Sequence, residues 1–356
     1  MANPSPPDAT TSVTGPSARQ PIRVLVLDGG GVRGLSSLII LRRIMEMVAV
    51  AKDISPHHAS SLRPAEYFDL VVGTGTGGLS ALFLGRLRMT VDQAIAAYQQ
   101  VTKAAFQPPS LISRTLQRST SSRNLERCIG DIVQRLLNDR DALLCDPVGD
   151  SGICRTAVLA CTSANTSAPP HVFRSYATSE PPSLFSILGV ARAAITAAGM
   201  PAVSLGNPPV QFMSAGLVGY NNPAEVALQE ASNIWRESHG RVDFLVSLGT
   251  GLQKLIHIGG RWKELTTTCE QIAHSCEPVH RRMYLTGQDM NMEYFRFNVP
   301  QGLEVDLREW MSPDSSPITG ITESYTRDPE VLKLLQSCVQ TLVGKMTTIW
   351  FTHGKY

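Results

Sequence analysis

The sequence predicts an α/β fold with a mainly parallel sheet, on three observations. Two segments, 22–48 and 67–87, each run from an apolar strand through a glycine-rich turn into a helix. Two further short apolar runs, 155–160 and 243–246, are bounded by turn residues and are typical of interior strands. Strands that alternate with helices form a parallel sheet that is covered by helices on both faces.

The first segment begins with the β-branched and apolar run Ile22–Leu27. The chain then turns through Asp28 and the three glycines that follow it. Between positions 35 and 48, apolar residues recur at the spacing of one helix face. This segment is therefore expected to form a strand, a glycine turn and a helix.

The second segment repeats this order. A predicted strand over 67–72 leads into the turn 73–78 and then into a strongly apolar helix over 79–87. Thr90 and Gln93 form the pattern of a capping box, in which each side chain satisfies a free amide at a helix start. A further helix is expected to run from there toward position 106.

Three regions are expected along the chain. Residues 1–20 are rich in Pro, Ser, Thr and Ala and are expected to form a disordered tail. The α/β domain is expected over 21–258, followed by a mostly helical C-terminal region over 259–356 that packs on this core and includes a helix around 329–342. The polar stretch 107–125 is expected to be a loop.

The composition narrows the class of protein. Lys and Arg number 32 against 30 Asp and Glu, so the chain has no basic surplus with which to grip nucleic acid. Seven cysteines without a C-x-x-C pair argue against a zinc site and a disulfide scaffold and favour a reducing compartment. No apolar run approaches the roughly 18 residues of a membrane helix, and no secretory signal is visible. We therefore expect a cytoplasmic protein.

Both glycine turns match the pattern G-x-G-x-x-G, which occurs in dinucleotide-binding proteins. That function needs a second strand that ends in an acidic residue about 20 positions later, and neither turn is followed by one. A phosphate-binding P-loop is excluded because neither turn ends in Gly-Lys-Ser/Thr. The turns are thus better explained by another chemistry.

Acyl transfer fits the two turns better. Successive backbone amides in a glycine turn that opens a helix can hold a developing oxyanion, which makes Gly29, Gly30 and Gly31 the candidate donors. Arg33 either adds positive charge to this site or is a solvated surface arginine. The second turn has the strand–turn–helix context of a nucleophile elbow, G-x-S-x-G, framed here by Gly73 and Gly77.

With these motifs the chain resembles the patatin-like phospholipases. The stretch 28–34, DGGGVRG, resembles their oxyanion-hole loop, and 73–78, GTGTGG, resembles their elbow, usually G-T-S-T-G-G. Three further stretches agree: ARAA at 191–194, GLVGYNNP at 216–223 and SLGTG at 247–251. The resemblance covers about residues 22–310. It implies a patatin-like three-layer α/β core and the activity of a lipid acyl hydrolase.

The resemblance fails at the two residues that should react. Family members use a Ser–Asp dyad, in which the elbow serine attacks the ester carbonyl and an aspartate activates it. Here the elbow position is Gly75, and alignment on Asn221-Asn222-Pro223 places Ala215 at the position of the aspartate. A glycine has no oxygen with which to attack, and an alanine cannot accept a proton. Natural loss and deliberate replacement of the two residues would look the same in the sequence.

Other residues could in principle replace the dyad, but each has a simpler explanation. Thr74 and Thr76 flank the elbow and are expected to bond to nearby backbone, since side chains alternate at a tight turn. Ser80 is expected to pack within a helix, Ser214 to end a strand, and Cys161 to act as a small buried apolar residue. The eight histidines show no metal-ligand spacing.

The resemblance therefore supports two functions. The first is a non-hydrolytic pseudoenzyme that binds a lipid or fatty-acyl ligand, or an inactivated phospholipase. The alternative is an active acyl hydrolase, acyltransferase or biosynthetic enzyme that uses the oxyanion hole with a non-standard nucleophile. In either case we expect no cofactor, no metal and no nucleic acid, and peripheral contact with a membrane.

Overall fold

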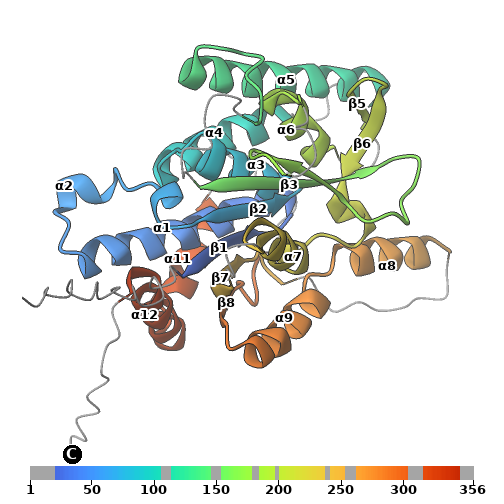
Figure 1. Ribbon diagram of the computed structural model, residues 1–356. Helices are drawn as coiled ribbons and strands as arrows, with labels where there is room; N and C mark the ends of the chain where they lie inside the picture. Colours follow the sequence, from blue (N-terminus) through green and yellow to red (C-terminus); the bar gives the residue numbers. More distant parts are fainter. Residues whose placement is uncertain are drawn as a thin grey trace, which may run out of the picture.

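The computed structural model describes residues 21–105, 114–145, 154–178, 184–196, 200–236, 241–252, 262–303 and 316–344. Within these residues eight strands form one sheet, and helices lie above and below it (Figure 1). The predicted tail over 1–20 lies outside the described residues.

The sheet is mainly parallel, as the sequence predicts. Its order is β5-β6-β3-β2-β1-β7-β8, and β4 pairs with β3. The central pairs β3–β2, β2–β1, β1–β7 and β7–β8 are parallel, whereas β4, β5 and β6 pair in antiparallel fashion at one side. The strands are β1 (Ile22–Leu27), β2 (Leu70–Thr74), β3 (Arg155–Thr162), β4 (His171–Arg174), β5 (Val203–Leu205), β6 (Val210–Ser214), β7 (Val242–Leu248) and β8 (Glu293–Phe297).

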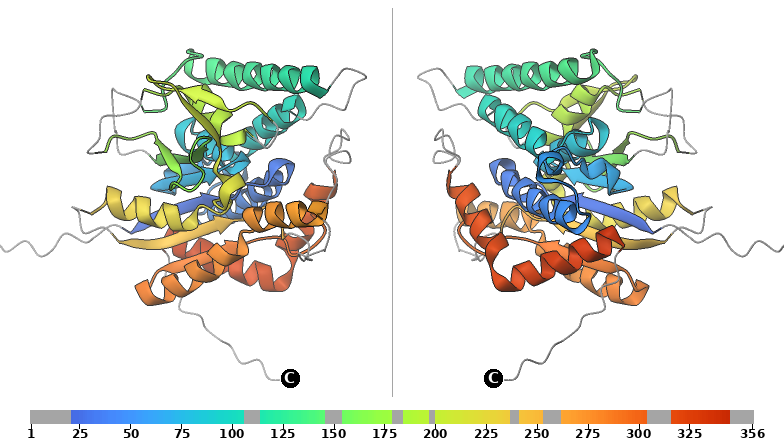
Figure 2. Two further views of the ribbon diagram at one scale, coloured as in Figure 1. Left: turned by 90° about the vertical axis from the view of Figure 1, so that its right-hand side faces the viewer. Right: turned by 90° about the vertical axis from the view of Figure 1, so that its left-hand side faces the viewer.

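Helices cover both faces of the sheet and produce three layers (Figure 2). The larger apolar core contains Leu25 and Leu27 of β1, and Val24 and Val26 on the alternate face belong to the smaller core. The larger core is covered by α1 (Gly34–Ala51), α3 (Thr76–Ala81), α4 (Val91–Ala105), α5 (Arg114–Leu137), α6 (Ile187–Ile195), α11 (Ser316–Arg327) and α12 (Pro329–Val343). The smaller core is covered by α7 (Ala224–Ile234) and α9 (Glu277–Met290).

Shorter elements complete the chain and position the loops. They are η1 (Gly31–Arg33), α2 (Pro56–Ala59), η2 (Pro64–Glu66), η3 (Leu82–Arg86), η4 (Ala215–Val218) and α8 (Trp262–His274), which contacts η4. The predicted helix over 79–87 is therefore α3 followed by η3, a π-helical turn. The capping box is confirmed: the amide of Thr90 donates to Gln93 Oε1 at 3.0 Å, and the amide of Gln93 donates to Thr90 Oγ1 at 3.3 Å.

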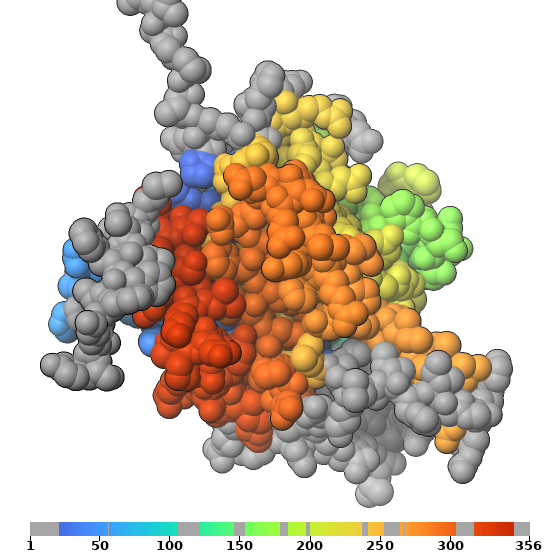
Figure 3. All heavy atoms as spheres, turned by 90° about the horizontal axis from the view of Figure 1, so that it is seen from below, coloured from blue at the N-terminus to red at the C-terminus, as the bar shows by residue number. Residues whose placement is uncertain are grey.

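Two segments differ from the sequence prediction. The expected loop over 107–125 is wrong from Arg114 on, where α5 begins, and its first part, 107–113, lies outside the described residues. The C-terminal part also contributes an unpredicted strand, β8, which pairs with β7 at the edge of the sheet. Seen from below, the elements between 262 and 344 form most of one face of the molecule (Figure 3).

Candidate functional site

The two glycine turns lie side by side at the carboxyl edge of the sheet. β1 and β2 are parallel neighbours, and Leu27 is paired with Gly73. The turn after β1 and the turn after β2 therefore leave the sheet at the same edge. The structure thus brings together two motifs whose first glycines, Gly29 and Gly73, are 44 positions apart in the sequence.

Gly75 occupies a sharp turn between β2 and α3. Its backbone dihedrals are φ +56° and ψ −131°, a combination that L side chains rarely adopt. Because α3 begins at the next residue, Thr76, strand, turn and helix follow one another directly. This is the backbone arrangement of a nucleophile elbow.

The flanking glycines are required by close backbone contacts. A Cβ atom on Gly73 would lie 2.1 Å from the carbonyl oxygen of Gly77, and one on Gly77 would lie 2.3 Å from the carbonyl oxygen of Leu27. Gly75 is different, because the nearest neighbours of a Cβ atom there would be Gly29 Cα and Ser214 Oγ, both at 3.4 Å. The elbow position therefore has room for a side chain beside the first glycine turn.

Gly29 is held by two other motifs of the resemblance. Its amide donates to the carbonyl of Asn221 at 3.0 Å, so Gly29, one of the three candidate oxyanion donors, has its amide already engaged. Its carbonyl accepts from Asn221 Nδ2 and from Thr250 Oγ1, both at 3.1 Å. Two stretches from much later in the chain thus fix the glycine turn, since Asn221 and Thr250 lie 192 and 221 positions after Gly29.

Gly30 and Gly31 leave their amides free. Neither amide forms a hydrogen bond to any described residue. Gly31 has φ +58°, and the space beside its Cα is open. Its carbonyl accepts from Thr76 Oγ1 at 3.1 Å and from the hydroxyl of Tyr98. Burial raises the pKa of Tyr98, so its hydroxyl stays protonated and able to donate at neutral pH.

Arg33 ends η1, and its side chain is half-buried. Its positive charge acts on the neighbouring Tyr98, where it opposes the effect of burial on the pKa of the phenol. The guanidinium is therefore close to the hydroxyl that holds the Gly31 carbonyl. This position is compatible with a contribution of positive charge to the glycine turn.

The hydroxyls of the elbow segment are either hydrogen-bonded to backbone or buried. Thr76 donates to Gly31, as described above. The hydroxyls of Thr74 and Ser80 are buried and have no hydrogen-bond partner among the described residues, so the expectation that Thr74 bonds to nearby backbone is wrong. Cys161 donates to the carbonyl of Ser214 at 3.5 Å, and burial raises the pKa of its thiol. These four side chains behave as structural residues.

The stretch of chain that should carry the acid, from Gln211 to Pro223, contains no Asp or Glu. β6 ends at Ser214, and Ala215 begins η4 as a fully buried residue. Of the two, Ser214 is the one whose side chain lies within 4 Å of the elbow position. Sequence reasoning did not single out this contact, because it depends on the pairing of Ser214 with Ala160 in β3.

A buried ion pair lies directly behind the glycine turn. Arg296 of β8 donates to Asp28 Oδ2 at 2.6 Å and to Ser247 Oγ at 2.8 Å. Asp28 is completely buried, which raises the pKa of its carboxyl, and the Arg296 guanidinium opposes this rise. Asp28 belongs to the glycine motif, but its partner could not be inferred from the sequence because β8 was not predicted.

Comparison with known proteins decides the family. A family model described as patatin-like phospholipase matches residues 25–228, which is more than half of the chain. The chain belongs to the patatin-like phospholipase family. The predicted three-layer α/β core of the patatin type is therefore confirmed. The matched residues include both glycine turns, Ser214, Ala215 and the Asn221–Asn222 turn.

Curated relatives agree with this assignment. The chain is 27% identical over 332 residues to calcium-independent phospholipase A2-gamma of Rattus norvegicus, covering 88% of this chain and 40% of the relative. It is 29% identical to the Mus musculus protein of the same name, over 78% of this chain and 35% of the relative. Phospholipase A I of Arabidopsis thaliana is 26% identical over 88% of this chain and 27% of its own length. The chain thus spans less than half the length of these relatives.

No described helix is long and apolar enough to cross a membrane. The described part of the chain also holds no group of three or more His, Cys, Asp or Glu side chains that is arranged to bind a metal ion.

Proposed function

We propose that this chain is a patatin-like lipid acyl hydrolase homologue that binds an acyl lipid without hydrolysing it. The observation that carries the proposal is the geometry of Gly75. Its φ and ψ are those of a nucleophile elbow, and the space for a side chain is present, but no atom is there to attack an ester. The chain therefore forms the backbone of a nucleophile elbow without the nucleophilic side chain.

The amides of Gly30 and Gly31 are the groups that would hold the ligand. Both lack a partner among the described residues, and they lie just before and at the start of η1, so they are free to donate to the carbonyl of an acyl group. Arg33 would add positive charge. Donors of this kind without a nucleophile leave only residual catalysis, because bond formation to the carbonyl carbon is missing.

Ala215, at the position of the family's acid, supports the same function. It is fully buried and apolar, so no proton acceptor stands at the position of the family's acid. The ligand class, a lipid or fatty-acyl compound, follows from the family. Peripheral contact with a membrane and a cytoplasmic location stay predictions.

The proposal is tested by measuring binding and hydrolysis separately. The purified chain should bind a fluorescent long-chain acyl ester saturably and should hydrolyse a p-nitrophenyl acyl ester no faster than buffer does. Gly31→Pro removes an amide donor and is incompatible with φ +58°, so binding should weaken at least tenfold. Gly344→Pro is the matched control, since Gly344 also has a positive φ, +70°, with open space around it, but lies at the end of α12.

Two results would contradict the proposal. The first is ester hydrolysis that survives Thr74→Ala and Thr76→Ala, since it would show that a nucleophile exists elsewhere in the protein. The second is binding that Gly31→Pro and Gly344→Pro weaken equally, since the glycine turn would then not hold the ligand.

One observation favours the alternative, an active enzyme with a non-standard nucleophile. Ser214 Oγ lies 3.4 Å from the point that a Cβ atom on Gly75 would occupy, so a hydroxyl does stand beside the elbow. No carboxylate or imidazole hydrogen bond to this hydroxyl exists in the described part of the chain, which leaves it without an activating base. Under this alternative, Ser214→Ala abolishes ester hydrolysis; under the main proposal there is no hydrolysis to abolish.

A further inference from the structure

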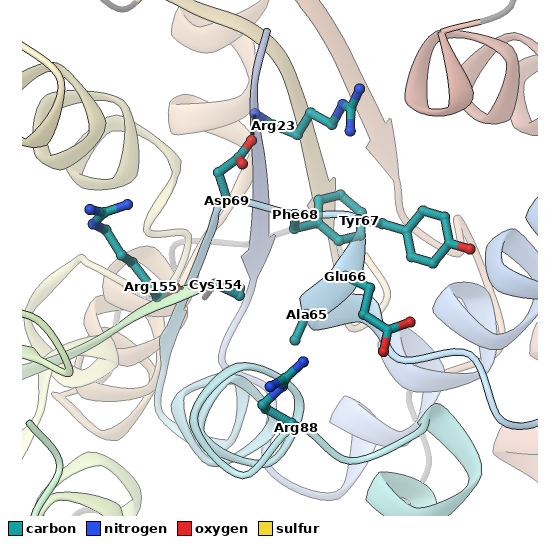
Figure 4. A pocket seen from close by; sticks show the side chains of 9 residues that line it. All are labelled: Arg23, Ala65, Glu66, Tyr67, Phe68, Asp69, Arg88, Cys154 and Arg155. Atoms are coloured by element: carbon teal, nitrogen blue, oxygen red, sulfur yellow. Dashed lines mark hydrogen bonds between the residues drawn. The ribbon is translucent and has the colours of Figure 1, made fainter. Parts of the chain in front are cut away.

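A pocket lies at the opposite edge of the sheet from the glycine turns. Its volume is about 340 Å³, within the range of small-molecule sites. It is formed where β1, β2 and β3 begin, so Arg23, Asp69 and Arg155 contribute to its wall together with Arg88, which follows η3 (Figure 4). The remaining lining residues are Ala65, Glu66, Tyr67, Phe68 and Cys154.

Arg88 has a guanidinium group without a hydrogen-bond acceptor among the described residues. Its Nε atom is buried and has no hydrogen-bond partner, and its guanidinium forms no ion pair within the described residues. Arg86, two positions earlier and also half-buried, shows the usual outcome for such an arginine, because it donates to the carbonyls of Leu143 and Leu144 at 3.0 and 2.8 Å. A buried guanidinium nitrogen without an acceptor is unfavourable, so a ligand that supplies one would be stabilised.

The backbone of Arg88 points to the same conclusion. Its φ is +50°, in the left-handed region. The other described non-glycine residues with positive φ are Asp53, Asn138 and Asn291, which are types that tolerate this region through short polar side chains. Arginine has no such advantage, and strained residues next to π-helical turns are often functional.

Arg88 is the arginine of this pocket that is directed into it. Arg23 and Arg155 lie across the pocket with side chains that diverge in Figure 4, and the Arg155 guanidinium lies over the rings of Trp235 and Tyr176, at 5.2 and 6.0 Å from their centroids. The Asp69 carboxylate already accepts from the amide of Arg23 at 2.7 Å. Burial raises the pKa of the Cys154 thiol, so this residue adds no negative charge. An anion in the pocket would therefore meet the Arg88 guanidinium.

We propose that this pocket binds a phosphate-bearing small molecule or headgroup, with the Arg88 guanidinium as its principal contact. A planar guanidinium donates two parallel hydrogen bonds to a phosphate, and no donor of the Arg88 guanidinium has an acceptor within the described residues. Because the pocket is larger than a phosphate ion, it also holds the organic part of the molecule. The site is separate from the elbow, so it stands or falls independently of the proposed acyl binding.

The test uses the full chain and two soluble probes, inorganic phosphate and glycerol 3-phosphate, in a phosphate-free buffer. Isothermal titration calorimetry and the ligand-induced shift of the melting temperature report binding. Arg88→Asn removes the charge but tolerates positive φ, and Arg88→Gly removes both the charge and the strain. Arg327→Asn is the control, since it removes an arginine that is 74% exposed on α11 and does not line the pocket.

We expect both probes to bind the wild type and Arg327→Asn alike, and to bind Arg88→Asn and Arg88→Gly at least tenfold more weakly. Arg88→Gly should melt no lower than the wild type, which shows that the loss of binding is not a loss of folding. Vesicles that contain phosphatidic acid distinguish the source of the phosphate. Binding that glycerol 3-phosphate displaces identifies a lipid headgroup, and binding of the soluble probes alone identifies a free phosphate compound.

The proposal would be overturned by equal affinity of the wild type and Arg88→Asn for both probes. It would also be overturned if neither probe gave heat or a melting shift at 10 mM, a concentration at which a site of millimolar affinity would be about nine-tenths filled.

Discussion

At the scale of single residues, Gly75 determines what the site can do. The elbow conformation, φ +56° and ψ −131°, is disfavoured for every residue except glycine, and enzymes accept this strain in order to raise a nucleophile above the sheet. Here the conformation is present without the side chain. The strain is therefore relieved by glycine, and this has a measurable consequence for stability.

Gly75→Ala should destabilise the fold by about 1–3 kcal/mol, the usual range for a strained backbone conformation. Its Cβ atom would have ordinary contacts at 3.4 Å, so the loss comes from the backbone and not from a clash. Gly320→Ala in α11 is the control, because nothing lies within 4 Å of its Cβ position and alanine favours a helix by about 1 kcal/mol. Urea unfolding should therefore give opposite signs for the two variants; equal effects would mean that the elbow is not held in this conformation.

At the scale of elements, the buried parts of the sheet could be predicted and its edges could not. β1, β2, β3 and β7 are apolar runs bounded by turn residues, which is a local signal. The capping box before α4 is equally local, and it was predicted correctly. These elements carry the glycine turns, so the location of the site could also be predicted.

The remaining elements depend on contacts between distant parts of the chain. The first residues of α5, Arg114 onward, are almost entirely polar, and the helix is held by a later stretch whose Ile129, Ile132 and Val133 are buried. β8 is short and contains Arg296, whose charge is acceptable only because Asp28 lies opposite it. The contact of Ser214 with the elbow depends in the same way on the pairing of β6 with β3. No local pattern encodes these partners.

At the scale of the whole molecule, the Asp28–Arg296 pair joins the C-terminal part of the chain to the glycine turn. The side chain of Arg296 is 6% exposed and that of Asp28 is 0% exposed. Both charges are thus removed from water, and each depends on the other for compensation. The fold of the candidate site therefore depends on a strand that follows the match to the family model.

Arg296→Met should destabilise the fold by about 3–5 kcal/mol, because it leaves the Asp28 carboxylate buried without a partner. Addition of Asp28→Asn to this variant should recover a large part of the loss. Arg282→Met is the control, since Arg282 pairs with Glu225 through two hydrogen bonds but is 56% exposed, and its loss should cost about 1 kcal/mol or less. Urea unfolding measures all three.

The pH dependence gives this prediction a second readout. Without Arg296 the pKa of Asp28 rises further in the folded state, so the folded state binds a proton that the unfolded state has already lost. The destabilisation by Arg296→Met should therefore be smallest at acidic pH and should grow as the pH rises through the folded-state pKa. A destabilisation that is equal to that of Arg282→Met and independent of pH would show that the pair is not buried in solution.

The most direct test of the central claim, that the elbow and oxyanion frame lack only their two reacting residues, is the hydrolysis of a p-nitrophenyl acyl ester by Gly75→Ser, Ala215→Asp and the double variant. The elbow has room for the serine, and the two groups act as a unit, so each single variant should stay near buffer level. The double variant should gain hydrolysis well above either single variant while its circular dichroism matches the wild type. Hydrolysis by Gly75→Ser alone, or a folded double variant without hydrolysis, would contradict the claim.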